Sequence, residues 1–167
     1  MSDQTARTPT ALVVDDDPAI LQLLEELLQE AGFATTCMTH AHPALATLAE
    51  RSFDLLLVDQ WLPDGNGLQI CEAARTSHGN ESAVLIVTAD ARRERQVLAL
   101  QLCADDFISK PFDIEELVAR IDSRLRWVAR ARSQGNTPAE LRTDAPSAGQ
   151  PGDAAGPAST RGDWAGR

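Results

Sequence analysis

The amino-acid sequence predicts an α/β domain in which helices cover both faces of a parallel sheet. Two apolar runs, Leu55–Val58 and Ala83–Val87, contain no polar alternation, which is typical of strands that are buried on both faces. Amphipathic segments lie between the apolar runs, and strands that alternate with helices form parallel sheets through right-handed crossovers. These observations indicate a domain built from repeated strand–helix units.

Five strands are expected along the chain. They are Leu12–Val14, the weaker Ala34–Met38, Asp54–Val58, Ala83–Val87 and Phe107–Ser109. For a sheet of this kind we expect the flavodoxin-like strand order 2-1-3-4-5. The predicted architecture is therefore a (βα)5 three-layer sandwich with a five-stranded parallel sheet in the middle.

Five helices are expected after the strands. Asp17 and Pro18 predict the start of the first helix, because a carboxylate can cap the free amides and proline is favoured at the first helical position. Gly32 marks its end. The other helices are predicted at Pro43 to about Arg51, Leu68 to about His78, residues 91–103, and from the capping residue Asp113 to about Val128.

Size and composition allow one domain with a proper core. The chain has 167 residues, of which 43% are hydrophobic, and its apolar runs are far shorter than the roughly 18 residues that span a bilayer. No apolar signal sequence follows Met1. Cys37, Cys71 and Cys103 are odd in number and scattered, so we expect free thiols in the core and a reducing, cytoplasmic location. The net charge of −10 argues against direct binding to nucleic acid.

The composition also suggests three regions. Residues 1–9 are expected to be a flexible N-terminus, and residues 10–132 contain all the predicted strands and helices. Residues 133–167 are rich in Ala, Gly, Pro and Ser and are expected to be a disordered tail, because they offer too little apolar surface to offset the entropy of ordering. This tail is either a free end or a linker.

Polar side chains follow four of the predicted strands. Asp15 and Asp16 follow the first strand, Asp59 the third, Thr88 the fourth and Lys110 the fifth. These four strands are neighbours in the expected order, so the five side chains should converge at one edge of the sheet, where open α/β sheets bind ligands.

This cluster predicts a magnesium-dependent phosphoryl-transfer site. Carboxylates about 4 Å apart repel by roughly 4 kcal/mol per pair at an effective dielectric constant near 20, and a single lysine cannot neutralise three of them. An all-oxygen set of ligands suits Mg²⁺, whereas zinc is disfavoured because no His or Cys lies at these strand ends. An aspartate such as Asp59 can attack phosphorus and form an acyl phosphate, while Lys110 and Thr88 stabilise the phosphoryl oxygens.

The motifs around these residues resemble the receiver domain of two-component response regulators. The resemblance covers about Thr10 to Arg132. It rests on the segments Val13–Pro18, Val58–Gly67, Val87–Ala89 and Ala104–Phe112. Each motif is modest alone, but together, in this order and at these strand ends, they are very specific.

The resemblance implies a role for each residue at the strand ends. Asp59 would be the phosphoacceptor and would take the phosphoryl group from a sensor histidine kinase or a phosphotransfer protein. Asp16 and Asp59 would bind Mg²⁺ directly, Asp15 would bind it through water, and the backbone carbonyl of Trp61 would be a further ligand. Lys110 would pair with the phosphoryl group.

The resemblance also implies a switch made of Thr88 and Phe107. The hydroxyl group of Thr88 would move toward the phosphate and the ring of Phe107 would follow inward, which would reshape the face formed by the fourth helix, the fifth strand and the fifth helix. A phosphorylation-dependent homodimer would use the same face. Four charged residues map to it: Asp105, Asp106, Glu116 and Arg120. Gln96 and Trp127 stand where related transcription regulators often carry basic residues, so this face looks incomplete.

We therefore expect a stand-alone receiver that relays its signal by protein contacts with an unknown target, without binding nucleic acid or membranes. It would be a phosphoacceptor signalling protein and not an enzyme with a separate substrate, although members of this family catalyse their own phosphorylation and dephosphorylation. One alternative is the receiver portion of a DNA-binding transcriptional regulator. Another is an Mg²⁺-dependent phosphohydrolase, but Trp61 occupies the place of the second acid that such enzymes use.

Several nearby residues have simpler interpretations. Asp17 fits a helix cap alone, and Phe107 could be an ordinary core residue. The segment from Asp64 to Gly67 predicts a turn in which the glycines supply positive φ angles. The three histidines, His40, His42 and His78, should lie in solvent away from the site.

Trp61 is bulky for its position, two residues after Asp59. Our hypothesis is that it shields the acyl phosphate from water and lengthens its life, while Asp90 could oppose this effect.

Overall fold

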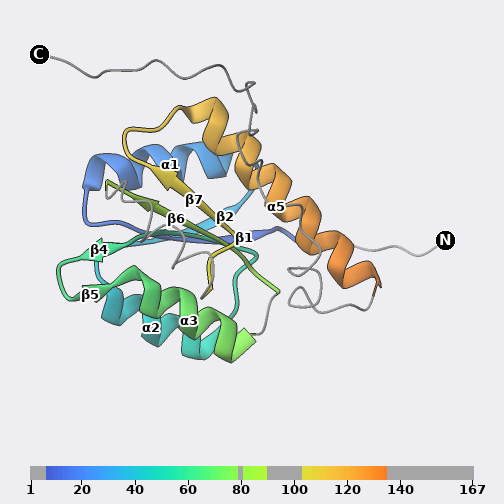
Figure 1. Ribbon diagram of the computed structural model, residues 1–167, viewed down its shortest axis with the longest axis horizontal. Helices are drawn as coiled ribbons and strands as arrows, with labels where there is room; N and C mark the ends of the chain where they lie inside the picture. Colours follow the sequence, from blue (N-terminus) through green and yellow to red (C-terminus); the bar gives the residue numbers. More distant parts are fainter. Residues whose placement is uncertain (1–6, 79–80, 90–102, 135–167) are drawn as a thin grey trace, which may run out of the picture.

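The computed structural model describes residues 7–78, 81–89 and 103–134, in which a five-stranded parallel sheet lies between two layers of helices (Figure 1). The strands of this sheet are β1 (Thr10–Val14), β2 (Ala34–Met38), β3 (Leu55–Asp59), β6 (Ala83–Thr88) and β7 (Asp106–Ser109). They pair in parallel in the order β2-β1-β3-β6-β7. The predicted flavodoxin-like order is confirmed.

Four helices cover the sheet in the described part of the chain. Helices α1 (Pro18–Glu30) and α5 (Ile114–Gln134) lie on one face, and α2 (Ala41–Glu50) and α3 (Gly67–His78) lie on the other (Figure 1). The fourth predicted helix, residues 91–103, falls almost entirely outside the described residues, as do Asp90, Gln96 and residues 135–167. None of the described helices combines the length and apolar character that crossing a bilayer requires.

The sheet separates the core into two halves. Leu12 and Val14 of β1 belong to the half beneath α2 and α3, whereas Ala11 and Val13 belong to the half beneath α1 and α5. All four side chains are fully buried, because successive residues of a strand point to opposite faces and both faces are covered. This is why the strands show no polar alternation in the sequence.

The predicted ends of α1 are confirmed. Asp17 Oδ1 accepts a hydrogen bond from the amide of Ala19 at 2.9 Å, and Pro18 occupies the first helical position. Gly32 has φ of 87°, a conformation that costs glycine little, and the amide of Phe33 donates to the carbonyl of Leu28 at 2.9 Å. Local sequence signals therefore determine both ends of this helix.

The loop after β3 forms a small hairpin that the sequence did not predict, with β4 (Trp61–Leu62) antiparallel to β5 (Gly65–Asn66). The expectation that Gly65 and Gly67 supply positive φ angles is wrong, because Gly32 is the one glycine of the described residues with a positive φ. Gly67 is instead needed for close approach, since a Cβ atom there would overlap the carbonyl oxygen of Asp59.

Asp64 caps helix α2 from across this loop. Its carboxylate accepts hydrogen bonds from the amides of Ala41 at 2.6 Å and His42 at 2.9 Å, and the ring of His42 lies 2.6 Å away. Desolvation would raise the pKa of Asp64, but these donors outweigh it and hold the pKa well below its usual range. The helix consequently starts before Pro43, and His42, although mostly exposed, is not simply solvated as predicted.

The cysteines are buried in part as predicted, but two of them are not free thiols. Cys71 of α3 and Cys103 are joined by a disulfide with a Cα–Cα distance of 5.7 Å. The expectation of free core thiols is therefore wrong for this pair and holds for Cys37. The two positions are 32 residues apart in the chain, so their spacing gave no signal of pairing.

Candidate functional site

Four strands of the sheet end at the same edge, and each brings a polar residue there. Asp59 is the last residue of β3 and Thr88 the last residue of β6, while Asp15 directly follows β1 and Lys110 directly follows β7. All four strands run in parallel as neighbours. Parallel pairing therefore assembles the predicted cluster from four distant parts of the sequence.

Lys110 lies at the centre of the cluster. Its Nζ atom is 2.6 Å from Oδ2 of Asp15 and 2.6 Å from Oδ2 of Asp59. The Lys110 side chain is 16% exposed and those of Asp15 and Asp59 are 2% and 9% exposed, so solvent screens these ion pairs poorly. The amide of Lys110 also donates to the carbonyl of Thr88 at 2.8 Å, and the peptide bond to Pro111 is cis. The ammonium group thus bridges two carboxylates from two different strands.

Backbone amides hold the other carboxylate oxygens. Asp15 Oδ1 accepts from the amide of Asp17, and Asp59 Oδ1 accepts from the amide of Trp61, each at 3.0 Å. Asp16, which is exposed, completes a group in which one oxygen of each of the three carboxylates lies within 4.8 Å of the others. Three carboxylates with oxygen donors only fit a hard divalent cation such as Mg²⁺.

Negative charge exceeds positive charge at this site. Burial raises the pKa of Asp15, although the hydrogen bonds from Lys110 and Asp17 act in the opposite direction. Burial alone would lower the pKa of Lys110, but its hydrogen bonds to Asp15 and Asp59 outweigh this effect, so the pKa is raised and the ammonium stays charged. One positive charge faces three carboxylates, and a bound cation would relieve the remaining repulsion.

Neutralising one carboxylate should therefore stabilise the metal-free protein. We expect Asp16→Asn to raise the melting temperature in the presence of EDTA by roughly 3 °C, because repulsion within the group falls while no hydrogen bond described above is lost. Added Mg²⁺ should stabilise the parent more than this variant. Differential scanning fluorimetry with EDTA and with Mg²⁺ measures both effects, and an unchanged or lower melting temperature in EDTA would contradict this electrostatic interpretation.

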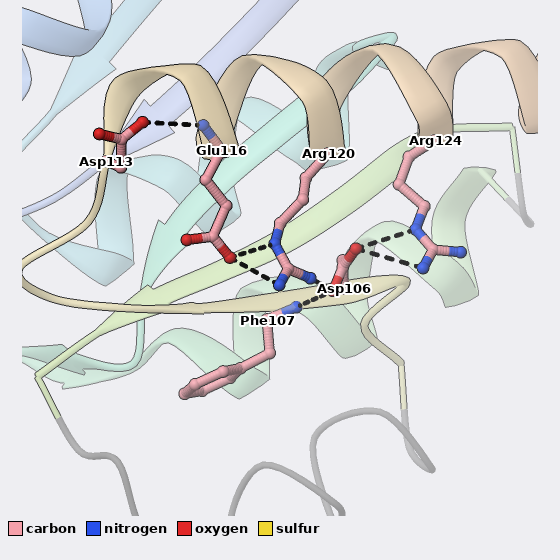
Figure 2. A network of polar contacts seen from close by, with 6 residues as sticks. All are labelled: Asp106, Phe107, Asp113, Glu116, Arg120 and Arg124. Atoms are coloured by element: carbon pink, nitrogen blue, oxygen red, sulfur yellow. Dashed lines mark hydrogen bonds and ion pairs between the residues drawn. The ribbon is translucent and has the colours of Figure 1, made fainter. Parts of the chain in front are cut away.

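The two predicted switch residues lie on β6 and β7, two of the strands that end at the cluster. Thr88 is fully buried and directly follows Val87, the residue that pairs with Asp59 across the sheet. Phe107 is 8% exposed, and its ring points away from α5 into the core half beneath α2 and α3 (Figure 2). Trp61 is 46% exposed, and its backbone amide donates to Asp59. The structure thus places the residues predicted from the sequence at or around one edge of the sheet.

Comparison with known proteins gives the family. Residues 11–122 match the response regulator receiver domain. The chain belongs to this family. The chain is 38% identical over 137 residues to the transcriptional regulatory protein CpxR of Escherichia coli K12, covering 80% of this chain and 58% of that protein. It is 39% identical over 115 residues to the DNA-binding response regulator MtrA of Mycolicibacterium smegmatis, covering 69% of this chain and 50% of that protein.

Solved receiver domains have the same fold. The CheY-like receiver domain protein from Methanospirillum hungatei superposes with a TM-score of 0.69 at 30% identity, covering 73% of this chain and 97% of that one. The beryllofluoride-activated receiver domain of DrrB superposes with a TM-score of 0.66 at 30% identity, covering 71% and 98%. The receiver domain here thus matches nearly the whole length of solved receiver domains, whereas the chain spans only about half the length of the curated relatives above.

The charged face of the receiver domain differs from the one predicted. Both oxygens of Asp106 are occupied within the chain, Oδ1 by Arg120 at 2.9 Å and Oδ2 by Arg124 at 3.2 Å, while Arg120 also pairs with Glu116 at 2.7 Å (Figure 2). The Glu116 hydrogen bond and the nearby Asp106 raise the pKa of Arg120, against the effect of burial. These contacts form an ionic network between β7 and α5.

Two further residues of that face point elsewhere. The carboxylate of Asp105 is 4% exposed and forms an ion pair with Arg75 of α3 at 2.6 Å. The expectation that Asp105 belongs to the exposed charged face is therefore wrong. Trp127 packs partly buried against the core half beneath α1 and α5. Of the four charged residues predicted there, Asp106, Glu116 and Arg120 remain together.

Sequence reasoning missed three residues that shape the receiver domain near its site. Gly67 lets the start of α3 approach the carbonyl of Asp59, Asp64 ties the loop after β3 to α2, and Arg75 ties α3 to the loop before β7. The Asp-Gly-Asn-Gly run signals a turn in the sequence, but not these partners, which depend on contacts between distant segments.

Proposed function

We propose that this receiver domain accepts a phosphoryl group on Asp59 from a histidine kinase or a phosphotransfer protein. The supporting observation is that Lys110 Nζ lies 2.6 Å from both Asp59 and Asp15 at the end of the sheet, with Asp16 close by. An Asp59 oxygen would attack phosphorus, form the new O–P bond and displace the imidazole of the donor's phosphohistidine. The product is an acyl phosphate on the chain itself.

The residues around Asp59 support distinct parts of this reaction. Lys110 carries a fixed positive charge next to the position where the phosphoryl oxygens would lie, and Thr88 would donate a hydrogen bond to one of them. The amide of Trp61 holds Asp59 Oδ1 in place. Asp15, Asp16, Asp59 and the carbonyl of Trp61 would hold Mg²⁺, which when bound neutralises charge on the phosphoryl group.

We propose that phosphorylation passes the signal on by changing the surface of the receiver domain. Movement of Thr88 toward the phosphoryl group and of Phe107 within the core would alter the face that includes β7 and α5, and the signal would pass on by protein contact. The ionic network of Asp106, Arg120 and Arg124 lies on this face and is attached to the switch, since Asp106 Oδ1 also accepts from the amide of Phe107 at 2.8 Å (Figure 2).

Incubation with acetyl phosphate tests the proposed reaction. The protein with Mg²⁺ should gain one phosphoryl group, and the same protein with excess EDTA should gain almost none. Intact-mass measurement over a time course reads the result. Equal labelling with and without Mg²⁺ would contradict the proposed role of the carboxylate group.

Loss of the Trp61 ring should shorten the life of the acyl phosphate. The exposed ring follows Asp59 by two residues, where it can cover the site from water, so Trp61→Ala should lose its phosphoryl group at least about threefold faster, an effect equivalent to ~0.7 kcal/mol of activation barrier. Trp61→Phe keeps an aromatic cover and should decay at nearly the parental rate. Decay of the labelled proteins after removal of the donor measures this, and unchanged or slower decay in Trp61→Ala would refute the shielding role.

A second candidate is the receiver portion of a DNA-binding transcriptional regulator. The observation in its favour is that the matched relatives are named as a transcriptional regulator and a DNA-binding response regulator, while this chain spans only 58% and 50% of their lengths. A gel-shift experiment with the intact gene product, with and without acetyl phosphate, separates this candidate from a receiver that acts by protein contact alone.

A further inference from the structure

We propose that the Cys71–Cys103 disulfide is a redox-controlled tie that sets how readily Asp59 is phosphorylated. The proposal rests on the function proposed above. The disulfide joins α3 to the residue that lies three positions before β7, the strand that carries Phe107 and precedes Lys110. Its Cα–Cα distance of 5.7 Å lies at the centre of the range for disulfides, so the two backbones need no shift to form it.

Noncovalent contacts hold the same loop, so the fold should survive reduction. Arg75 lies one helical turn after Cys71, and its Nε atom donates to the carbonyl of Cys103 at 2.8 Å. Its Nη2 atom is 2.6 Å from Oδ2 of Asp105, which also accepts from the amide of Val84 at 2.8 Å. Opening the disulfide would therefore loosen the segment 103–105 without releasing it.

In the reduced form, the thiol of Cys103 would also have a hydrogen-bond acceptor. The carbonyl oxygen of Leu68 lies 3.9 Å from Cys103 Sγ, within the range in which a thiol donates a weak hydrogen bond. Both cysteines are buried among apolar side chains, where a reduced cysteine behaves as a small hydrophobic residue. The site thus accommodates both redox states, as a reversible device requires.

The tie is coupled to the switch through the core. Phe107 packs in the same core half as Cys71 and Cys103, and only three residues separate it from Cys103 in the chain. In the structure the disulfide is closed and Phe107 is 8% exposed. A closed disulfide should therefore favour the inward position of Phe107, and phosphorylation by a small donor is faster when more of the protein is already in the competent arrangement.

The chemistry needs a peroxide as oxidant and a dithiol as reductant. One thiolate attacks hydrogen peroxide, breaks its O–O bond and becomes a sulfenic acid, and the hydroxide released takes up the proton that the thiol had lost. The second thiol then displaces water from the sulfenic acid to form the disulfide. A dithiol reverses this in two exchange steps and is itself oxidised to a disulfide. Because the sulfur atoms are buried, both directions require local opening of the segment around Cys103.

The test compares the two redox forms of the full chain. Each is prepared with hydrogen peroxide or with a dithiol, unfolded and alkylated: the oxidised form should take one alkyl group, on Cys37, and the reduced form three. In the native protein Cys37 should react slowly, because burial and, to a smaller extent, Glu25 raise the pKa of its thiol to about 11. The initial rate of labelling by acetyl phosphate with Mg²⁺ should be at least about threefold higher in the oxidised form.

Single variants identify the pair. Cys71→Ala and Cys103→Ser should each label at the same rate after peroxide and after dithiol treatment, whereas Cys37→Ala should keep the difference. Equal rates in the two forms of the parent, or a redox effect that survives in Cys71→Ala, would overturn the proposal.

A readout that does not need phosphorylation separates this proposal from the proposed function. Amide hydrogen exchange of residues 103–109 should be slower in the oxidised parent than in the reduced parent. If neither form takes up a phosphoryl group, the proposed function fails. The proposal of a redox-controlled disulfide fails if amide hydrogen exchange of residues 103–109 is equally fast in the oxidised and the reduced parent.

Discussion

Replacing Lys110 with methionine should slow phosphorylation of Asp59 by about 100-fold or more. Loss of one preorganised charged donor at a reacting centre typically costs 10²–10³ in rate. Lys110 Nζ is the group that contacts both Asp59 and Asp15, and methionine keeps an unbranched apolar chain of similar length without the charge. Intact mass over a time course with acetyl phosphate and Mg²⁺ gives the rate.

Lys110→Arg is the matched control for charge. It keeps the positive charge but replaces a compact ammonium with a planar fork, so we expect a rate between those of the parent and Lys110→Met. Lys110 is the only lysine among the 167 residues, so amine reagents can modify only this side chain and the N-terminus. A folded Lys110→Met protein that labels at the parental rate would contradict the role given to this residue.

Gly67→Ala should destabilise the protein by about 3 kcal/mol, the upper part of the range for overpacked positions. A Cβ atom at residue 67 would overlap the carbonyl oxygen of Asp59 and lie 2.8 Å from Cγ1 of Val58, and both neighbours belong to the central strand β3. Relief of this overlap must move either α3 or the end of β3. Phosphorylation should therefore fall together with the free energy of unfolding, which urea denaturation measures.

Gly65→Ala is the matched control in the same loop. Its Cβ atom would lie 3.0 Å from Cβ of Ala41 and 3.2 Å from a side-chain oxygen of Gln69, and the glutamine can move aside. We expect a clearly smaller loss of stability than in Gly67→Ala. Equal losses in the two variants would mean that close approach to Asp59 is not the reason for glycine at residue 67.

The strand order and the main site could be predicted because both depend on local signals that repeat along the chain. Unbroken apolar runs identify strands buried on both faces, and a parallel sheet then brings the residues that follow its strands to one edge. Asp15, Asp59 and Lys110 were expected together for this reason, and the structure places Lys110 within 2.6 Å of both carboxylates. The ends of α1 were predictable because Asp17 and Gly32 act on adjacent backbone.

The features that were not predicted all depend on contacts between distant segments. The start of α2 was predicted too late because its cap is distant in the sequence. Asp64 caps the amide of Ala41, 23 residues away, whereas α1 is capped by the adjacent residue Asp17. Asp105 looked like a surface charge until α3 brought Arg75 beside it. In the same way, the positive φ expected at Gly67 followed from turn statistics, whereas the packing of α3 against β3 is what requires a glycine.

The measurement that tests the central claim most directly is the mass of the chain after incubation with acetyl phosphate and Mg²⁺, compared between the parent, Asp59→Asn and Asp17→Asn. Asp17 belongs to the same acidic run as Asp15 and Asp16, but its carboxylate caps α1. The parent and Asp17→Asn should each gain one phosphoryl group, and Asp59→Asn should gain none. Equal labelling of the parent and Asp59→Asn, or no labelling of the parent, would contradict Asp59 as the phosphoacceptor.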